Sequence, residues 1–301
     1  MQKKTAALIG STSFLISHLA PVLASNNFDI HFFGRKVNPQ FPNATFTKFD
    51  YPDFPLDFTI LEKFDLIVFA SSLGVQHGIN EPKEWIYDVN TFLPSRLLLH
   101  LDKVAYKGCI FTFGSYAEIG KNNLESTAFN EEELISSPFP VANDYAGSKR
   151  MLTSFIFNNS FNFPYYHLIL PTIYGEGENK NRLIPYLING IKNNQEMTLT
   201  AGEQTRQYIY IGDMVQVILE MIQTLPQSGI YNAPATETLK IKDVIDRVFL
   251  RLKGDKNLIK SNNNRGDVAM KSLILNSSKL LKKLKFKASV NIEEAVDLYN
   301  I

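Results

Sequence analysis

The chain has 301 residues, 45% hydrophobic and 20% charged, a composition typical of one large globular domain or of one domain with a smaller lobe. Lys and Arg number 31 and Asp and Glu 30, so the net charge of +1 predicts neither a nucleic-acid partner nor an anionic membrane partner. The single cysteine, Cys109, excludes an internal disulfide and favours a cytoplasmic location.

Short apolar runs alternate with helix-like stretches along the first half of the chain. Strands are predicted at 5–9, 29–33, 65–70, 108–113 and 166–170, and helices at 14–24, 84–101 and 141–158. This alternation predicts an α/β fold of the Rossmann type, a doubly wound parallel sheet with helices on both faces.

The second half contains more turns and reads as a smaller lobe. Helices are predicted at 182–193, 213–224, 241–252 and 292–299, and strands at 197–200 and 207–211. We therefore expect a nucleotide-binding domain over 1–170 plus about 206–235, and a C-terminal substrate-binding lobe over about 171–205 and 236–301.

The segment KKTAALIGSTSFLISHLAPVLAS, residues 3–25, has two interpretations. Its two lysines, apolar run and small residues are typical of a secretory signal. However, the run contains polar residues such as Thr12 and His18, and it supplies the first strand and helix that the alternating series needs. We therefore expect a strand, a turn and a helix here.

The turn I-G-S-T-S-F-L-I-S-H-L, residues 9–19, lies where a dinucleotide-binding fold needs glycines for a tight bend and for close approach of the pyrophosphate. It resembles the T-G-x-x-G-F-I-G-S-H-L turn of the extended short-chain dehydrogenases/reductases, the sugar-nucleotide epimerase/dehydratase family. Only Gly10 is kept. Ser13 would offer its amide and hydroxyl to phosphate, and Ile16 would need a wider helix–strand gap. The alternative is a plain buried strand and helix. The resemblance implies cofactor contacts at Gly10, Ser11, Thr12, Ser13, Phe14 and Leu15.

The next stretch, F-F-G-R-K at 32–36, bears on the choice of cofactor. NAD-selective sites usually place an acidic residue here for the ribose hydroxyls, whereas this chain has Arg35 and Lys36. Two cations suit a 2′-phosphate, which favours NADP over NAD; the alternative is a solvated basic loop. Asp50 matches the family's acidic residue near the adenine.

Tyr145 and Lys149 lie four residues apart in N-D-Y-A-G-S-K-R, so a helix places them on one face. Reduction of a ketone needs a proton donor at the oxygen, and a free tyrosine has a pKa near ~10. A nearby ammonium favours the phenolate and lowers that pKa, and lysine has further donors for the cofactor's ribose. This spacing predicts a proton-transfer pair that also contacts the cofactor.

Three other stretches in the first half resemble the family. F-G-S-Y-A-E-I-G, residues 113–120, resembles S-S-x-x-V-Y-G and places Ser115 on the catalytic serine or threonine, sharing the substrate oxygen with Tyr145. Asn90 falls on the family's asparagine behind the site, which implies a further cofactor contact. I-V-F-A-S-S-L-G resembles the end of a cofactor-lining strand, with Ala70 and Ser71 against the cofactor.

The second half continues the resemblance. L-I-L-P-T-I-Y-G-E-G-E resembles L-R-x-x-N-V-Y-G-P-G, and L-T-A-G-E-Q-T-R-Q-Y-I-Y-I-G-D resembles G-x-x-x-R-D-F-I-Y-V-x-D. There Arg206 would grip the diphosphate and Asp213 would anchor the loop. A late R-G-D supplies Arg265, shifted by one position from the family's arginine. The resemblance implies a cofactor contact at Pro171 and substrate contacts at Ser72, Ser115, Thr172, Arg182, Arg206 and Arg265.

Two activities remain for a member with these residues. Tyr116 and Ala117 replace the acidic pair that 4,6-dehydratases carry, and Ala117 replaces the cysteine of the GDP-fucose-forming epimerase–reductases. We favour an NADPH-dependent reductase of a nucleotide-linked 4-keto-6-deoxyhexose, supplying deoxysugar for surface polysaccharide, with Tyr145 as proton donor. The alternatives are an NAD-dependent nucleotide-sugar 4-epimerase and a non-catalytic dinucleotide sensor.

The resemblance also implies a homodimer through a four-helix bundle, formed by the helices at 84–101 and 141–158 from each copy. Its contacts would include Met151, Leu152, Phe155 and Ile156, whose alternative place is against the sheet. We expect a nucleotide-diphosphate sugar as the small-molecule partner, and no metal and no membrane-spanning helix.

Overall fold

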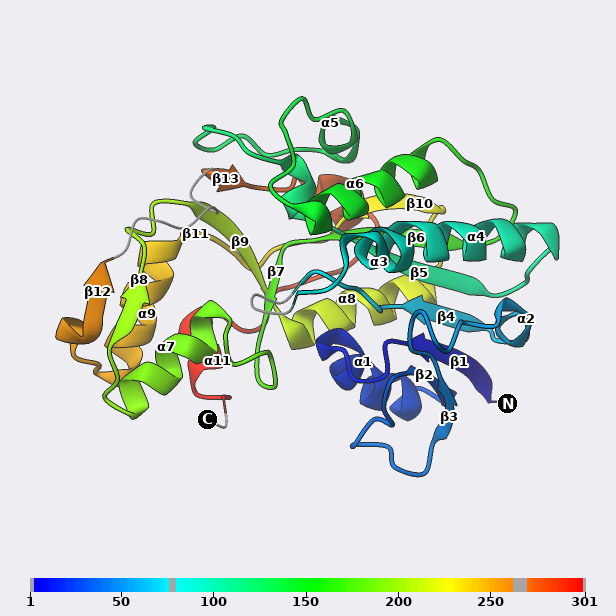
Figure 1. The fold of residues 1–301 in the computed structure, drawn as a ribbon, viewed down its shortest axis with the longest axis horizontal. Coiled ribbons are helices and arrows are strands. Elements are labelled where there is room, and N and C mark those ends of the chain that lie inside the picture. The colour runs from blue at the N-terminus through cyan, green and yellow to red at the C-terminus, as the bar shows by residue number, and fades with distance from the viewer. Residues whose placement is uncertain (1–2, 76–79, 262–269, 300–301) are drawn as a thin grey trace. The chain divides into compact units, whose positions relative to one another are not determined.

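The computed structural model describes residues 3–75, 80–261 and 270–299 (Figure 1). The chain divides into two compact units. The first comprises 1–118, 143–169 and 218–231, and the second 119–142, 170–217 and 232–301. The second unit includes 119–142 and 206–217, both of which were expected with the nucleotide-binding domain.

A seven-stranded sheet forms the centre of the first unit, in the order β10-β6-β5-β4-β1-β2-β3. The pairings β1–β2, β1–β4, β2–β3 and β4–β5 are all parallel, which confirms the predicted fold class. The strands are β1 (Lys4–Ile9), β2 (Phe28–Gly34), β3 (Thr45–Lys48), β4 (Leu66–Phe69), β5 (Cys109–Ser115), β6 (Tyr165–Leu170) and β10 (Gly229–Asn232).

The first strand occupies the middle of this sheet. β1 pairs with β2 on one side and β4 on the other, and Ala6 to Ile9 are fully buried. The order reverses between β1 and β4, and in open α/β sheets ligands bind at such a switch point, outside the carboxyl ends of the strands. The segment at 3–25 thus forms the strand, turn and helix expected of it.

Helices cover both faces of the sheet. Figure 1 shows α4 and α6 side by side on one face and α1 on the other, as right-handed crossovers in opposite directions require. The predicted helix at 84–101 is three segments, because a π-helical turn, η1, separates α3 from α4. The helices are α1 (Phe14–Ser25), α2 (Phe58–Leu61), α3 (Lys83–Tyr87), η1 (Asp88–Phe92), α4 (Leu93–Lys103), η2 (Tyr116–Ile119) and α6 (Asp144–Phe157).

The second unit is built on a four-stranded sheet in which β9 pairs with β7, β11 and β13, while β8 and β12 form a separate pair. Helices α7, α9 and α11 enclose its hydrophobic core. Helix α8 (Ile211–Thr224) runs from this unit into the first. The strands are β7 (Thr172–Tyr174), β8 (Met197–Leu199), β9 (Thr205–Tyr210), β11 (Glu237–Lys240), β12 (Ile259–Ser261) and β13 (Ser272–Leu273). The helices are α5 (Glu131–Ile135), α7 (Leu183–Lys192), α9 (Ile241–Leu252), η3 (Lys256–Leu258), α10 (Ser278–Leu281) and α11 (Ile292–Val296).

Within the described ranges, no helix has both the length and the apolar character needed to cross a bilayer.

Candidate functional site

The turn after β1 has the conformation that a dinucleotide-binding turn needs. Gly10 adopts φ +100°, and a Cβ there would lie 2.9 Å from the carbonyl carbon of Ala70, just beyond β4. Ser13 is the N-cap of α1, and its hydroxyl accepts the amide of Ile16 at 3.3 Å. Ile16, at a glycine position of the family, is fully buried on α1. Glycine at position 10 therefore allows the turn to lie directly against the end of β4.

The start of α1 leaves backbone donors for an anion. The amide of Ser17 donates to the carbonyl of Ser13, so the amides of Phe14 and Leu15 precede the first intrahelical bond and have no acceptor within the helix. With the positive end of the helix dipole they suit a diphosphate. The Ser13 amide, to which sequence reasoning gave this role, donates to the carbonyl of Gly10 at 2.8 Å. The turn therefore fits a dinucleotide, with Phe14 and Leu15 as its main donors.

Two exposed cations follow β2 on a tethered loop. Gly34 ends β2, and a Cβ there would overlap the Ser11 hydroxyl. That hydroxyl donates to the carbonyl of Lys36 at 2.6 Å, and the fully buried Asn38 donates to the carbonyl of Ser11 at 2.7 Å. These bonds hold the loop against the first turn and leave the Arg35 and Lys36 side chains exposed.

The remaining predicted cofactor residues of this unit lie at strand ends and turns. Ala70 and Ser71, directly after β4, are half-buried. Thr12 is exposed in the first turn. Asp50 is half-buried beyond β3, where its backbone bridges to Phe54.

Asn90 has a positioning role. It lies in η1 with 1% of its surface exposed. Its side-chain oxygen accepts the Ser72 hydroxyl and the Leu73 amide, both at 2.9 Å. Its amide nitrogen donates to the Leu73 carbonyl at 2.9 Å and to the Ser148 hydroxyl at 3.0 Å. The residue thus ties the loop after β4, including the predicted substrate residue Ser72, to helix α6.

The predicted proton-transfer pair lies beside the strand that ends in Ser115. The Lys149 Nζ is 5.9 Å from the centre of the Tyr145 ring and donates to the carbonyl of Phe113 on β5 at 2.9 Å. Ser115 is buried, and its Oγ accepts the amide of Ala117 at 3.2 Å. Lys149 therefore connects the helix that carries the tyrosine to the strand that carries the serine.

Burial changes the protonation of Lys149. Desolvation lowers the pKa of its amine to about 8, and the negative charge of Glu118 opposes this change. The amine therefore still carries its proton at neutral pH, but loses it at a lower pH than an exposed lysine does.

Sequence reasoning missed a buried polar group behind this pair. Glu118 in η2 is fully buried, and its Oε1 accepts the Ser115 amide at 2.7 Å while its Oε2 accepts the Thr153 hydroxyl at 2.6 Å. Burial raises the pKa of Glu118 to about 7, although its hydrogen bonds and the charges of Lys149 and Arg150 act against that rise. The signal in the sequence was an acidic residue where the resembled S-S-x-x-V-Y-G pattern has valine.

His167 on β6 belongs to the same network. It is fully buried, with Nδ1 2.8 Å from the Thr112 hydroxyl and Nε2 2.9 Å from the Thr153 hydroxyl. Burial lowers its pKa to about 3, so the ring is neutral at neutral pH. The histidine is hydrogen-bonded at both ring nitrogens inside the core.

Three of the predicted residues in the second unit, Arg182, Arg206 and Asp213, have partners within that unit. Pro171 is buried and Thr172 half-buried at the start of β7. Arg182 precedes α7 and forms an ion pair with Glu178 at 3.0 Å. Arg206 on β9 is 6% exposed and donates to the carbonyl of Thr205 at 2.8 Å. Asp213, predicted to anchor a loop, accepts the amide of Ser289. Arg265 lies outside the described residues.

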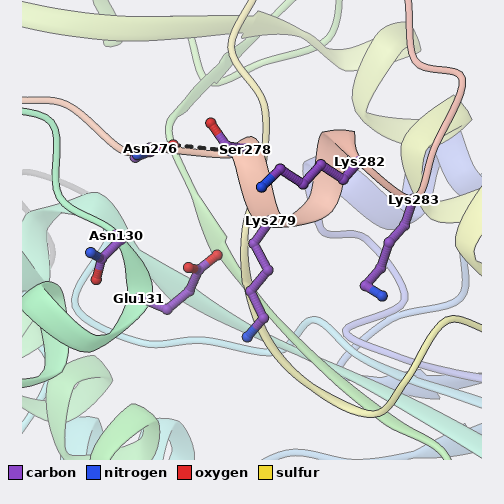
Figure 2. Close-up of a pocket in the computed structure, with 7 residues that line it drawn as sticks. All are labelled: Asn130, Glu131, Asn276, Ser278, Lys279, Lys282 and Lys283. Carbon is purple, nitrogen blue, oxygen red and sulfur yellow. Dashed lines mark hydrogen bonds between the residues drawn. The ribbon is translucent and has the colours of Figure 1, made fainter.

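A pocket of about 420 Å³ lies in the second unit and contains none of the predicted residues (Figure 2). Its lining residues are Asn130, Glu131, Asn276, Ser278, Lys279, Lys282 and Lys283. In the parts of the chain that the structure describes, no cluster of three or more His, Cys, Asp or Glu side chains is placed to hold a metal ion.

We expect Lys149 in the cofactor-free protein to titrate near pH 8, well below an ordinary lysine, because burial penalises its charge. As the pH rises through this value, the ammonium and the stabilisation it gives a Tyr145 phenolate are lost together. Carbon NMR of protein labelled at lysine Cε, with Lys149→Met to assign the signal, gives the midpoint. A midpoint at the ordinary lysine value would contradict the expectation.

Comparison with known proteins identifies the family. Residues 6–233 match the model of the NAD dependent epimerase/dehydratase family. CDP-abequose synthase of Salmonella muenchen is 23% identical over 97% of this chain and 96% of its own length. dTDP-4-dehydro-6-deoxyglucose reductase of Escherichia coli is 26% identical over 41% of this chain and 40% of its own. The solved UDP-N-acetylglucosamine 4-epimerase of Methanobrevibacter ruminantium M1, in complex with UDP-N-acetylmuramic acid, superposes with a TM-score of 0.80 at 20% identity, covering 99% of this chain and 98% of that one. The chain belongs to the NAD dependent epimerase/dehydratase family, and the protein is an enzyme of that type.

Proposed function

We propose that this enzyme reduces the 4-keto group of a nucleotide-linked 4-keto-6-deoxyhexose, using NADPH, in deoxysugar biosynthesis for surface polysaccharide. The observation that carries the proposal is the contact of Lys149 with both the Tyr145 ring and the strand that ends in Ser115. The name of the Escherichia coli relative, a dTDP-4-dehydro-6-deoxyglucose reductase, supports this substrate class.

Tyr145, Lys149 and Ser115 would share the proton chemistry. A bound NADPH would supply the hydride that reaches C4 of the sugar. The Tyr145 hydroxyl gives its proton to the C4 oxygen, and the Lys149 ammonium stabilises the phenolate that remains. The Ser115 hydroxyl, held by the Ala117 amide, donates to the same oxygen and withdraws its developing charge.

The tethered loop after β2 supports NADPH as the cofactor. The amides of Phe14 and Leu15 would bind the diphosphate, and Arg35 and Lys36 would bind the 2′-phosphate. Gly34 has no side chain to reach the ribose hydroxyls, and the Ser11 hydroxyl already fills that space. Ala70, Ser71 and Pro171 would line the cofactor, with Asp50 near the adenine.

The sugar nucleotide would take its contacts from arginines and small polar residues. Arg206 and Arg182 would grip the diphosphate, because guanidinium groups match phosphate oxygens in pairs. Arg182 already pairs with Glu178, so this ion pair would have to share the guanidinium with the diphosphate. Ser72 and Thr172 would bind the sugar, and Arg265 would be a further ligand of the sugar nucleotide.

We expect Tyr145→Phe to lower kcat by about 100-fold or more, since a proton donor contributes that much to such reactions. The assay follows NADPH absorbance with CDP- and dTDP-linked 4-keto-6-deoxyglucose, with NADH in parallel. Tyr165→Phe is the matched control. Tyr165 is the first residue of β6, the strand next to β5, and so lies at the sheet edge opposite to the one where Ser115 ends β5. Full activity of Tyr145→Phe would refute the mechanism. If neither cofactor is consumed, UDP-galactose and UDP-N-acetylgalactosamine would test 4-epimerase activity, and binding without turnover would indicate a sensor.

The basic loop gives a separate prediction. Arg35→Ala should raise KM for NADPH about 10-fold or more, because a charge-assisted hydrogen bond is worth about 1.5–3 kcal/mol. KM for NADH should change little, since NADH has no 2′-phosphate. The control is Lys63→Ala, an exposed lysine in the turn after α2. Equal effects on both cofactors would place Arg35 away from the 2′-phosphate.

We also propose a homodimer through the faces of α4 and α6. These helices contact one another and expose Leu99 at 50% and Met151 at 44%, whereas Leu152 and Ile156 are buried within the protomer. Phe155 is half-buried. Exposed apolar side chains on adjacent helices are typical of a helix-bundle interface.

Sedimentation velocity tests this surface. We expect the unmodified protein to sediment as a dimer and Leu99→Asp as a monomer, because a buried unpaired carboxylate disrupts an apolar contact. Leu250→Asp, at a residue 79% exposed on α9, is the control and should stay dimeric. A dimer that persists in Leu99→Asp would rule out this interface.

A further inference from the structure

A fully buried carboxylate next to a catalytic pair needs a physical reason. Removing a carboxylate from water is costly, and an apolar residue of similar size usually serves a core at least as well. Glu118 is nevertheless 0% exposed, and its two oxygens each accept a hydrogen bond. Gly114 makes room for it, because a Cβ there would lie 2.6 Å from the Glu118 Oε1 and 2.8 Å from the His167 Nε2.

Above its pKa of about 7 Glu118 is ionised, and its hydrogen bonds then determine the protons around it. The Thr153 hydroxyl has one proton, and the ionised Glu118 Oε2 at 2.6 Å is a nearer acceptor for it than the Lys149 carbonyl at 3.1 Å. The His167 Nε2, 2.9 Å from the Thr153 oxygen, must then be the donor of that pair. Because the ring is neutral, its Nδ1 carries no proton and accepts the Thr112 hydroxyl at 2.8 Å. The Glu118 carboxylate therefore fixes the tautomer of His167 through two successive hydrogen bonds, with Thr153 between them.

The same carboxylate acts on both members of the site that it approaches. Its Oε1 holds the amide of Ser115, which fixes the backbone of that residue. Its negative charge favours the ammonium form of Lys149, against the burial that disfavours it. The charged or titratable groups that face it are Lys149 and Arg150 from α6 and His167 from β6. Arg150 also donates to the Glu118 backbone carbonyl at 2.8 Å.

We propose that Glu118 is a positioning residue of this site: it fixes Ser115 through its amide, sets the His167 tautomer through Thr153, and maintains the positive charge of Lys149. The proposal rests on the proposed function in taking Ser115 and Lys149 as site residues. Glu118 itself touches neither substrate nor cofactor in this role. It acts through side chains that do.

Glu118→Gln tests the charge. The amide oxygen can still accept the Ser115 amide, and the amide nitrogen can donate to Thr153, so size and bonding are kept while the charge is lost. We expect the Lys149 midpoint to fall by about one pH unit, as loss of a neighbouring opposite charge requires. Glu131→Gln, at another buried glutamate that accepts a backbone amide, is the control and should leave the midpoint unchanged. An unchanged midpoint in Glu118→Gln would overturn the proposal.

Thr153→Val removes a hydrogen bond that favours the ionised form of Glu118. The pKa of Glu118 should then rise above about 7, and the carboxyl should lose its charge in the range where Lys149 titrates. We therefore expect the Lys149 midpoint to fall in the same direction as in Glu118→Gln; an unchanged or raised midpoint would overturn the proposal.

A measurement on the unmodified protein covers the case in which the variants do not fold. Nitrogen NMR of labelled histidine at pH 8 should show His167 protonated at Nε2 and not at Nδ1; the opposite tautomer would overturn the proposal. The Lys149 midpoint and the His167 tautomer are measured on the free protein, without a sugar nucleotide. A failed reductase assay would therefore not affect the Glu118 proposal, and a contrary NMR result would not affect the reductase proposal.

Discussion

The burial of one amine connects helix α6 to the central sheet of the first unit. Lys149 is 6% exposed, and its hydrogen bond to Phe113 joins helix α6 to strand β5. A lysine inside a protein loses solvation that a single neutral acceptor does not restore, so its charge depends on what else is buried nearby. The buried negative charge of Glu118 favours the charged form of Lys149. That charge in turn acts on Tyr145, one helical turn away.

The fold could be predicted wherever strands were long and apolar. The runs at 5–9, 65–70, 108–113 and 166–170 formed β1, β4, β5 and β6, each of which has four or more consecutive buried residues. The run at 29–33 formed β2, which is also mostly buried. The strands without such a signal, including β7, β11 and β13, are two to four residues long and depend on pairing with β9. The π-helical turn that contains Asn90 was not predicted either. The four side-chain hydrogen bonds of this residue join segments that are far apart in the sequence, the loop after β4 and helix α6.

The candidate site was predicted where spacing carries chemistry and missed where tertiary packing does. Four-residue spacing was enough to place Tyr145 and Lys149 on one helix face. A glutamate in a turn normally lies in water, whereas Glu118 is buried and bonded to Thr153, which in turn contacts His167 on another strand. These partners are 35 and 14 residues apart in the sequence from the groups they contact, so the sequence pattern did not reveal them. In the first turn the residue types indicated a phosphate site at Ser13. However, the Ser13 amide donates to Gly10 and its hydroxyl accepts from Ile16, so the amides of the next two residues are the available donors.

The close fit of Ser11 over Gly34 couples two positions that lie 23 residues apart in the sequence. A Cβ at position 34 would overlap the Ser11 hydroxyl, so that hydroxyl would have to move. The same hydroxyl donates to the carbonyl of Lys36, and a larger residue at 34 would therefore also break the bond that holds the following loop. Removal of the hydroxyl would not make room, because the Cβ would still lie 2.9 Å from the amide nitrogen of Ser11. The backbone as well as the side chain of Ser11 therefore restricts position 34 to glycine.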